Sequence, residues 1–254
     1  MDATLQDLRL APALTRRLAA ELADRRYAFA GGVSLQAACA LPAAVWHDFA
    51  DAWNRLTLDR YMGDGGCYRY RRYGEFELAS PDGALTRLPH GPYRQPSYIN
   101  PLNGGVDRHF DPLEDGFVAN PLFDGLLRSL AAVFDQAQGW SGPWNIRLHP
   151  YRIRADGATP GLPTPEGLHR DGVDFIVTLL VARRNVEGGE TTVTDADGQL
   201  LHRHTLTHPL DLLLADDART MHAVSPVLRR EPEQEAWRDV LVVAYTRPLT
   251  RRDA

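Results

Sequence analysis

The chain has 254 residues, of which 44% are hydrophobic and 24% are charged, a composition typical of a globular protein. Its 28 basic and 33 acidic residues give a formal net charge of −5. This balance argues against a nucleic-acid partner, because such proteins present a basic face. No apolar run approaches the ~20 residues that a membrane-spanning helix needs, so we expect no membrane partner either.

Two cysteines, Cys39 and Cys67, lie far apart in the sequence and indicate reduced, buried thiols. The first 20 residues mix charged and apolar positions and lack the apolar core of a secretory signal. We therefore expect a cytoplasmic protein. The length is compatible with a single domain spanning residues 1–254, and no pattern indicates a particular oligomeric state.

Residues 1–60 predict a helical cap. Leucines recur at near-helical spacing from Leu5 to Leu22, and Pro12 predicts a break between two short helices. A further amphipathic helix is predicted over residues 41–58, with Pro42 at its first position.

Residues 61–143 predict a strand, a long active-site loop and a helix. The alternation in CYRYRRYGEFEL, which begins at Cys67, indicates a strand whose arginines face either a cavity or solvent at a sheet edge. Residues 81–121 are rich in Pro, Gly and Asn, which predicts an ordered binding loop or lid. Helical periodicity returns over residues 121–138 and ends near Gly139.

Residues 144–254 predict the main β core, made of short strands separated by Gly-Gly and Asp-Gly turn signals. Helices followed by about eight strands indicate an α+β protein whose antiparallel strands form a sandwich or barrel. The clearest predicted strands begin at Trp144, run through the apolar segment 175–181, lie between Gly189 and Asp197, and cover Val240 to Tyr245.

A candidate metal site lies in PEGLHRDGVDF. His169 and Asp171 stand two residues apart, and extended residues at this spacing point to the same side, so both could reach one metal ion. His222, 51 residues after Asp171, lies at a predicted strand border and offers a second imidazole. Two histidines and one carboxylate form the facial triad of non-haem Fe(II) oxygenases. His149 is a rival ligand that lacks a carboxylate two residues away.

Other interpretations of these histidines are weaker. His202, His204 and His208 form a loose cluster, but their spacing fits none of the usual zinc patterns. The same three-residue cage could hold zinc in a hydrolase or isomerase, although such sites mostly use three histidines, or two histidines and a glutamate. A non-catalytic metal-binding jelly-roll module is the alternative from another class of protein.

Five segments, RYRRYGEF, NPLNGG, PEGLHRDGVDF, GGET and WRDVLVV, together resemble the 2-oxoglutarate and iron dependent dioxygenase family that contains bacterial L-isoleucine hydroxylases. The resemblance runs from about Arg69 to the end of the chain, and PEGLHRDGVDF is its most specific element. It implies an α+β fold with a double-stranded β-helix (jelly-roll) core and flanking N-terminal helices.

The resemblance also implies the cofactor and its co-substrates. Fe(II) would be bound by His169, Asp171 and His222, and 2-oxoglutarate and O2 would be consumed with release of succinate and CO2. Arg238, 16 residues after His222, matches the arginine that binds the far carboxylate of 2-oxoglutarate in such enzymes.

The expected substrate is a small molecule, a free, aliphatic L-amino acid hydroxylated at an unactivated carbon. A carrier-linked or peptide-linked amino acid, or another natural-product intermediate, is the alternative. Binding a free amino acid needs a donor for its carboxylate, an acceptor for its ammonium group and an apolar pocket for its side chain. The candidate substrate-binding residues are Arg69, Arg71, Arg152, Tyr98, Asn103 and Asp174.

Overall fold

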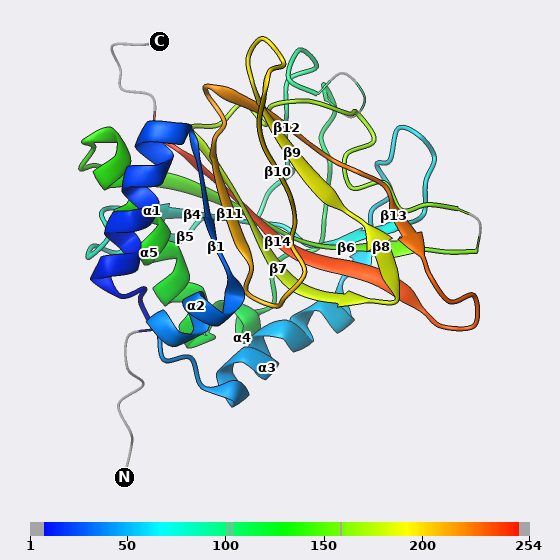
Figure 1. Ribbon diagram of the computed structural model, residues 1–254, viewed down its shortest axis with the longest axis horizontal. Coiled ribbons are helices and arrows are strands. Elements are labelled where there is room, and N and C mark those ends of the chain that lie inside the picture. The colour runs from blue at the N-terminus through cyan, green and yellow to red at the C-terminus, as the bar shows by residue number, and fades with distance from the viewer. Residues whose placement is uncertain (1–7, 101, 103, 158, 249–254) are drawn as a thin grey trace.

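The computed structural model describes residues 8–248 apart from 101, 103 and 158 (Figure 1). The helices are α1 (Pro12–Arg25), α2 (Gly32–Ala38), α3 (Ala43–Asp51), α4 (Asp115–Val118) and α5 (Pro121–Gln138). The strands are β1 (Tyr27–Ala30), β2 (Thr57–Leu58), β3 (Arg69–Arg71), β4 (Gly74–Leu78), β5 (Leu85–Arg87), β6 (Trp144–Ala155), β7 (Phe175–Arg184), β8 (Val186–Gly188), β9 (Glu190–Asp195), β10 (Leu200–Thr205), β11 (Leu212–Asp216), β12 (Thr220–Val224), β13 (Val227–Arg229) and β14 (Ala236–Thr246).

Helix α5 confirms the prediction for residues 121–138. The Asn120 side chain caps its first turn by accepting a hydrogen bond from the Leu122 amide at 2.9 Å, and Pro121 occupies the first helical position. Gly139 ends the helix in the left-handed conformation, with φ of 61°. Local signals alone were sufficient here because both ends are set by residues next to the helix.

Residues 8–60 differ from the predicted helical cap, and residues 1–7, which include the predicted helical position Leu5, lie outside the described residues. Among the described residues, Pro12 begins the single helix α1 instead of separating two helices. The helix predicted over 41–58 ends at Asp51, and a short 3-10 helix, Ala52–Arg55, follows it. Strand β1 lies between α1 and α2, where its backbone pairs with β11. That pairing joins segments far apart in the sequence, so local periodicity could not reveal it.

Three antiparallel sheets build the β core. The largest has the strand order β1-β11-β7-β14-β6-β3-β2, with β4 and β5 attached through β6. The smaller sheets have the orders β10-β9-β12 and β13-β8. Figure 1 shows β9, β10 and β12 lying across the large sheet, with α1 and α5 at the other side of the molecule. The predicted α+β fold with a double-stranded β-helix core is confirmed.

Period-two alternation divides the central strands into two faces. On β6, Trp144, Ile146 and Leu148 pack into the main hydrophobic cluster, together with the leucines and phenylalanines of α5. The alternate residues of the same strand, from Arg147 to Ile153, line a cavity instead. Strands β7 and β14 divide in the same way. Helices therefore cover one face of the large sheet, while the other face is available for a site.

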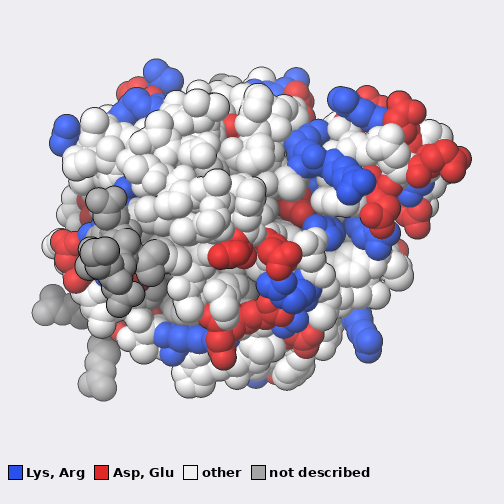
Figure 2. All heavy atoms as spheres, turned by 90° about the horizontal axis from the view of Figure 1, so that it is seen from below, with Lys and Arg blue, Asp and Glu red and all other residues white. Residues whose placement is uncertain are grey.

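The surface carries mixed charge. On the face shown in Figure 2, arginine side chains are interspersed with aspartates and glutamates and form no continuous basic surface. Within the described residues, no helix is long and apolar enough to cross a membrane. Both cysteines are free, but only Cys39 is buried; Cys67 is exposed, which corrects the prediction of two buried thiols. Cys67 lies in the loop before β3, where no packed element covers it.

Candidate metal centre

Backbone pairing brings the two predicted histidines together. The amide of His169 donates to the carbonyl of His222 at 3.0 Å, and the amide of His222 donates to the carbonyl of His169 at 2.8 Å. The two rings are consequently 4.4 Å apart, centroid to centroid. Asp171 follows two residues later, and Nε2 of His222 lies 3.5 Å from its Oδ2 atom. Within the described residues, one ligand atom from each of these three side chains lies within 4.8 Å of the others.

A buried aspartate fixes the loop that carries Asp171. The carboxylate of Asp217 accepts hydrogen bonds from the amides of Asp171, Gly172 and Val173 at 3.1, 2.8 and 3.0 Å. Burial raises the pKa of Asp217, the neighbouring Asp171 adds to this effect, and His222 and the amides oppose it. Gly172 permits the tight bend because its φ is +75°, a conformation that L side chains rarely adopt.

The protonation of both imidazoles suits metal binding. Nδ1 of His169 lies 2.9 Å from the Gly167 carbonyl, which can only accept, so Nδ1 carries the proton and Nε2 keeps its lone pair. Burial lowers the pKa of His222 to about 3; His169 adds to this effect and Asp217 opposes it. Two imidazoles and one carboxylate form a donor set that fits a divalent iron ion and leaves further positions free.

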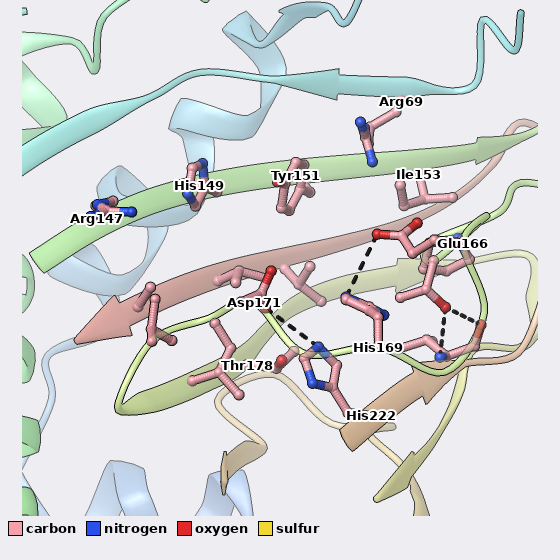
Figure 3. Close-up of a pocket in the computed structure, with 18 of the residues that line it drawn as sticks. Arg69, Arg147, His149, Tyr151, Ile153, Glu166, His169, Asp171, Thr178 and His222 are labelled. Carbon is pink, nitrogen blue, oxygen red and sulfur yellow. Dashed lines mark hydrogen bonds and ion pairs between the residues drawn. The ribbon is translucent and has the colours of Figure 1, made fainter. Parts of the chain in front are cut away.

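The three residues face a cavity whose opposite wall is the large sheet. Figure 3 shows Arg147, His149, Tyr151 and Ile153 in a row along β6. The candidate metal-binding group, His169, Asp171 and His222, lies across from them. The neighbouring strands contribute mostly short aliphatic side chains. These are Ile176 and Thr178 on β7, and Val240, Val242 and Ala244 on β14.

Arg238 lies in the same cavity and has an unusual environment. It is only 1% exposed, and its Nε and Nη2 atoms have no hydrogen-bonding partner among the described residues. Burial lowers its pKa to about 9, Arg183 contributes to the decrease, and Asp239 opposes it. Arg238 therefore still carries its charge at neutral pH. A buried guanidinium without an anion is costly, so this side chain suits a carboxylate ligand.

Strand register explains the position of Arg238. Its directly paired neighbours are Ile153 on β6 and Arg183 on β7, so the three side chains share one face of the sheet. Asp239 points to the other face, where Arg152 holds both of its oxygens at 2.8 and 2.7 Å. The carboxylate nearest in sequence is consequently not available to Arg238.

Gly189 allows the buried Arg238 and the half-buried Arg183 to lie close to the backbone. An added Cβ at this position would lie 3.0 Å from Cδ of Arg238 and 3.2 Å from Nη1 of Arg183. Arg183 is itself held by the Gly188 carbonyl at 2.9 Å. The Gly188-Gly189 pair was expected only as a turn signal, and the structure adds this close approach.

The arginines of β3 are buried and do not form a solvated edge. Arg69 lines the cavity and pairs with Asp59 at 2.8 Å. Burial opposes its charge, but Tyr151, Asp59 and Glu166 together raise the pKa of Arg69. Arg71 lies behind the cavity, 3.7 Å from Asp59, and donates a hydrogen bond to Nδ1 of His149.

His149, the rival ligand, is not part of the metal-binding group. Because Arg71 can only donate, Nδ1 of His149 is the acceptor, and the proton of the neutral ring is on Nε2. Burial and then Arg71 hold the pKa of His149 well below its ordinary value. Its ring lines the cavity as a neutral donor, while the ligand atoms that converge among the described residues come from His169, Asp171 and His222.

Four predicted substrate-binding residues lie outside the cavity, one of them Arg71 behind its wall. Arg152 faces the opposite side of β6 and pairs with Asp239, because neighbouring strand residues alternate in direction. Asp174 pairs with Arg247 at the surface. Tyr98 is 82% exposed, in an outer groove that Glu166 and His169 also line. Asn103 lies outside the described residues.

Sequence reasoning missed two acidic residues of the site. Asp217 follows Asp216 directly after β11, and this Asp-Asp pair before a short turn was the available signal. Glu166 stands three residues before His169, inside the motif already recognised as the most specific one. Its carboxylate lines the cavity, and Oε1 lies 3.6 Å from Nε2 of His169.

Comparison with known proteins gives consistent results. The profile of the family described as 2OG-Fe dioxygenase matches residues 50–244. The 3(1)-hydroxy-L-isoleucine 4-dioxygenase of Pantoea ananatis (strain AJ13355) is 27% identical over 237 residues, which cover 89% of this chain and 94% of that protein. The L-isoleucine-4-hydroxylase of Bacillus thuringiensis is 28% identical over 204 residues, which cover 77% of this chain and 80% of that protein. The crystal structure of a bsmA homologue from Methylobium petroleophilum PM1 matches with a TM-score of 0.85 and 34% identity, over 98% of both chains.

Proposed function

This chain belongs to the 2OG-Fe dioxygenase family, and we propose that it hydroxylates an unactivated carbon of a free, aliphatic L-amino acid. As a member of this family it is an enzyme that uses Fe(II), 2-oxoglutarate and O2. The substrate class follows from the two curated relatives, whose names describe dioxygenation of isoleucine or hydroxyisoleucine.

His169, Asp171 and His222 are the proposed iron ligands. Their ligand atoms converge within 4.8 Å, and their protonation leaves one lone pair on each imidazole for a metal. Asp217 holds the Asp171 loop through three backbone amides, so the carboxylate is positioned before any metal binds.

The observation that carries the proposal is the unpaired Arg238 in the same cavity. A keto diacid that chelates a metal through one end needs a cation for its far carboxylate, and Arg238 offers two free N–H groups there.

Bound iron, with 2-oxoglutarate and O2, supplies the oxidation in which 2-oxoglutarate is converted to succinate and CO2 while one oxygen atom enters the substrate. The chain itself binds and orients the reactants. The aliphatic side chains of Ile176, Val240 and Val242 line the cavity and keep water away from it. Tyr93, which is 8% exposed, closes the cavity on the side of the long loop.

The proposed activity can be tested with a panel of free L-amino acids, Fe(II), ascorbate and 2-oxoglutarate under air. We expect succinate to accumulate and one amino acid, isoleucine or a close analogue, to gain one oxygen atom by mass spectrometry. The absence of Fe(II)-dependent succinate with every amino acid would count against the oxygenase, and N-acylated or carrier-linked substrates would serve as the comparison.

The proposed ligands can be tested by His169→Ala and Asp171→Ala. Turnover of both variants should fall below detection, because each variant keeps only two of the three proposed iron ligands. Circular dichroism should show the fold unchanged, since both side chains are partly exposed to the cavity and not part of the core. Retained turnover in either variant would remove the metal assignment.

Two further proposals concern the whole chain. We propose that it acts as a single dioxygenase domain, because α1 and α5 share one hydrophobic cluster with β6, β7 and β14. We also propose that it acts in the cytoplasm, where a free and exposed thiol such as that of Cys67 stays reduced.

A further inference from the structure

We propose that Glu166 binds the ammonium group of the substrate and so restricts the enzyme to amino acids whose amino group is free. This inference rests on the proposed function, because it concerns the substrate of that same cavity. It assigns a specificity-determining role to a residue that neither the sequence pattern nor the family comparison singles out.

Among the acidic residues that line the cavity, Glu166 is the one to which the proposed function assigns no role. Its acidic members are Asp171 and Glu166, and Asp171 belongs to the proposed metal site. Its arginines are Arg69, Arg147 and Arg238, and Arg238 is assigned to 2-oxoglutarate. What remains for a substrate is one carboxylate, guanidinium groups and aliphatic walls, which together match the three parts of an aliphatic amino acid.

The Glu166 carboxylate lacks the partners that a buried anion needs. Its side chain is 12% exposed, and its Oε2 atom is fully buried with no hydrogen-bonding partner among the described residues. Its other oxygen, Oε1, is 3.6 Å from Nε2 of His169, too far for a good hydrogen bond. A buried carboxylate in this state is costly unless a cation or a donor reaches it.

Metal binding increases this need. His169 donates its Nδ1 proton to Gly167, so Nε2 is the atom left to coordinate a metal. An imidazole nitrogen that coordinates a metal has no proton to share with Glu166. In the metal-bound enzyme, the Glu166 carboxylate beside the reaction centre therefore lacks a hydrogen-bond donor. An ammonium group has three N–H donors and can supply one.

Arg69 gives the opposite charge on the same side of the cavity. Figure 3 shows its guanidinium above Glu166, and no ion pair joins the two side chains among the described residues. Arg69 uses Nε and Nη2 for Asp59, which leaves Nη1 for another acceptor. A carboxylate and a guanidinium that face one space without closing on each other suit a zwitterion, whose two groups carry the complementary charges.

The position of Glu166 also suits substrate entry. It lines both the inner cavity and the outer groove that contains Tyr98, Ile99 and Leu168. A substrate arriving through the groove meets this carboxylate beside His169, which lines both spaces as well. Its side chain can then extend along the valines of β14, next to the ligands of the metal.

Binding measurements without oxygen test the proposal directly. The wild-type enzyme, loaded with Fe(II) and 2-oxoglutarate, is titrated calorimetrically with L-isoleucine and with the 2-hydroxy acid that has the same side chain. Glu166→Gln removes the charge and keeps the shape. Glu233→Gln, at a solvent-exposed position, is the matched control with the same charge change.

We expect Glu166→Gln to raise the Kd for L-isoleucine about 10- to 100-fold, the usual effect of losing a hydrogen bond to a charged group. Its Kd for the 2-hydroxy acid should stay within about twofold of the wild-type value, because that ligand has no ammonium group. Affinities for Fe(II) and 2-oxoglutarate should not change, and the control should match the wild type throughout.

Several outcomes would overturn the assignment. Equal losses for both ligands in Glu166→Gln would indicate a purely structural role, and unchanged affinity for L-isoleucine would show that another group binds the ammonium. If the wild type bound no amino acid of a wider panel, this inference and the proposed substrate would fail together. Fe(II)-dependent succinate formation in that case would show that the oxygenase chemistry itself stands.

Discussion

Two pairs of arginines lie at the same end of the large sheet, with Arg183 half-buried and the other three buried, and the pairs differ in their charged surroundings. Arg69 and Arg71 on β3 share the carboxylate of Asp59, which is 2.8 Å from Arg69. Arg238 and Arg183, across Ile153 in the same row, have no carboxylate facing them among the described residues. The pKa of Arg69 is raised, whereas that of Arg238 is lowered to about 9 by burial and by Arg183.

The difference separates charges that hold the fold together from charges that are kept for a ligand. The carboxylate of Asp59 compensates part of the charge of the first pair, so loss of that carboxylate should reduce stability. The second pair lacks an anion until a ligand supplies one. Replacing an arginine of this pair should therefore weaken ligand binding and leave the fold intact. Substitutions at either pair of arginines therefore test this distinction.

Asp59→Asn should destabilise the protein by about 3–5 kcal/mol, because two buried guanidinium groups lose the carboxylate that pairs with both of them. Urea unfolding followed by circular dichroism measures the change. Asp82→Asn, at an aspartate that is 86% exposed, is the matched control and should stay within about 0.5 kcal/mol of the wild type. A loss below about 1 kcal/mol for Asp59→Asn would mean that the first pair is not structural.

Arg238→Met should raise the Kd for 2-oxoglutarate about 100-fold, which corresponds to about 2.7 kcal/mol, because both free N–H groups are lost. Stability should be equal or higher by about 1–2 kcal/mol, since an uncompensated buried charge is removed. Calorimetric titration and urea unfolding give the two values. A large loss of stability with normal 2-oxoglutarate binding would reverse the roles assigned to the two pairs.

Gly189→Ala should cost about 1–2 kcal/mol of stability, because its φ of +68° is strained for alanine. The new methyl group would also press on Arg238 and Arg183, so the Kd for 2-oxoglutarate should rise about tenfold. Gly198→Ala is the matched control, since its φ of +82° is equally strained and nothing lies near its Cβ position among the described residues. Equal 2-oxoglutarate affinity in the two variants would contradict the role of Gly189.

The pH dependence of stability should also differ between wild type and Arg238→Met. Arg238 has a folded pKa of about 9, below its ordinary value, so between these values the unfolded chain binds more protons than the folded one. Stability of the ligand-free wild type should therefore rise with pH above about 9, by up to ~1.4 kcal/mol per pH unit relative to the variant. Parallel curves from about pH 8 to 10 would show that Arg238 is not desolvated as described.

The metal-binding group shows how far sequence reasoning reached. His169 and Asp171 could be grouped because residues at i and i+2 of an extended segment share a side, and His222 could be added as an imidazole at a strand border. Asp217 could not be found in the same way, because its role depends on three amides of a loop 44 to 46 residues away. The sequence around Asp217 shows no periodicity that would indicate such contacts.

Arg152 shows where sequence reasoning gave the wrong direction. It was grouped with Arg69 and Arg71 as a cavity residue, but β6 presents its odd-numbered residues to the cavity and Arg152 to the other side. The alternation itself was recognised from Trp144 onward. The face that points inward depends on which sheet covers the strand, and that sheet comes from residues 190–224.

By itself, the sequence determined the helix over 121–138, the alternation of the central strands and the pairing of His169 with Asp171 on one side, because each depends on neighbours within a few residues. Only the tertiary structure decided which strand face lines the cavity, which buried arginine has an internal anion, and that Glu166 faces the cavity. Those properties depend on strand register and on contacts between distant segments, and an alternating pattern is compatible with either face until a second sheet covers one of them.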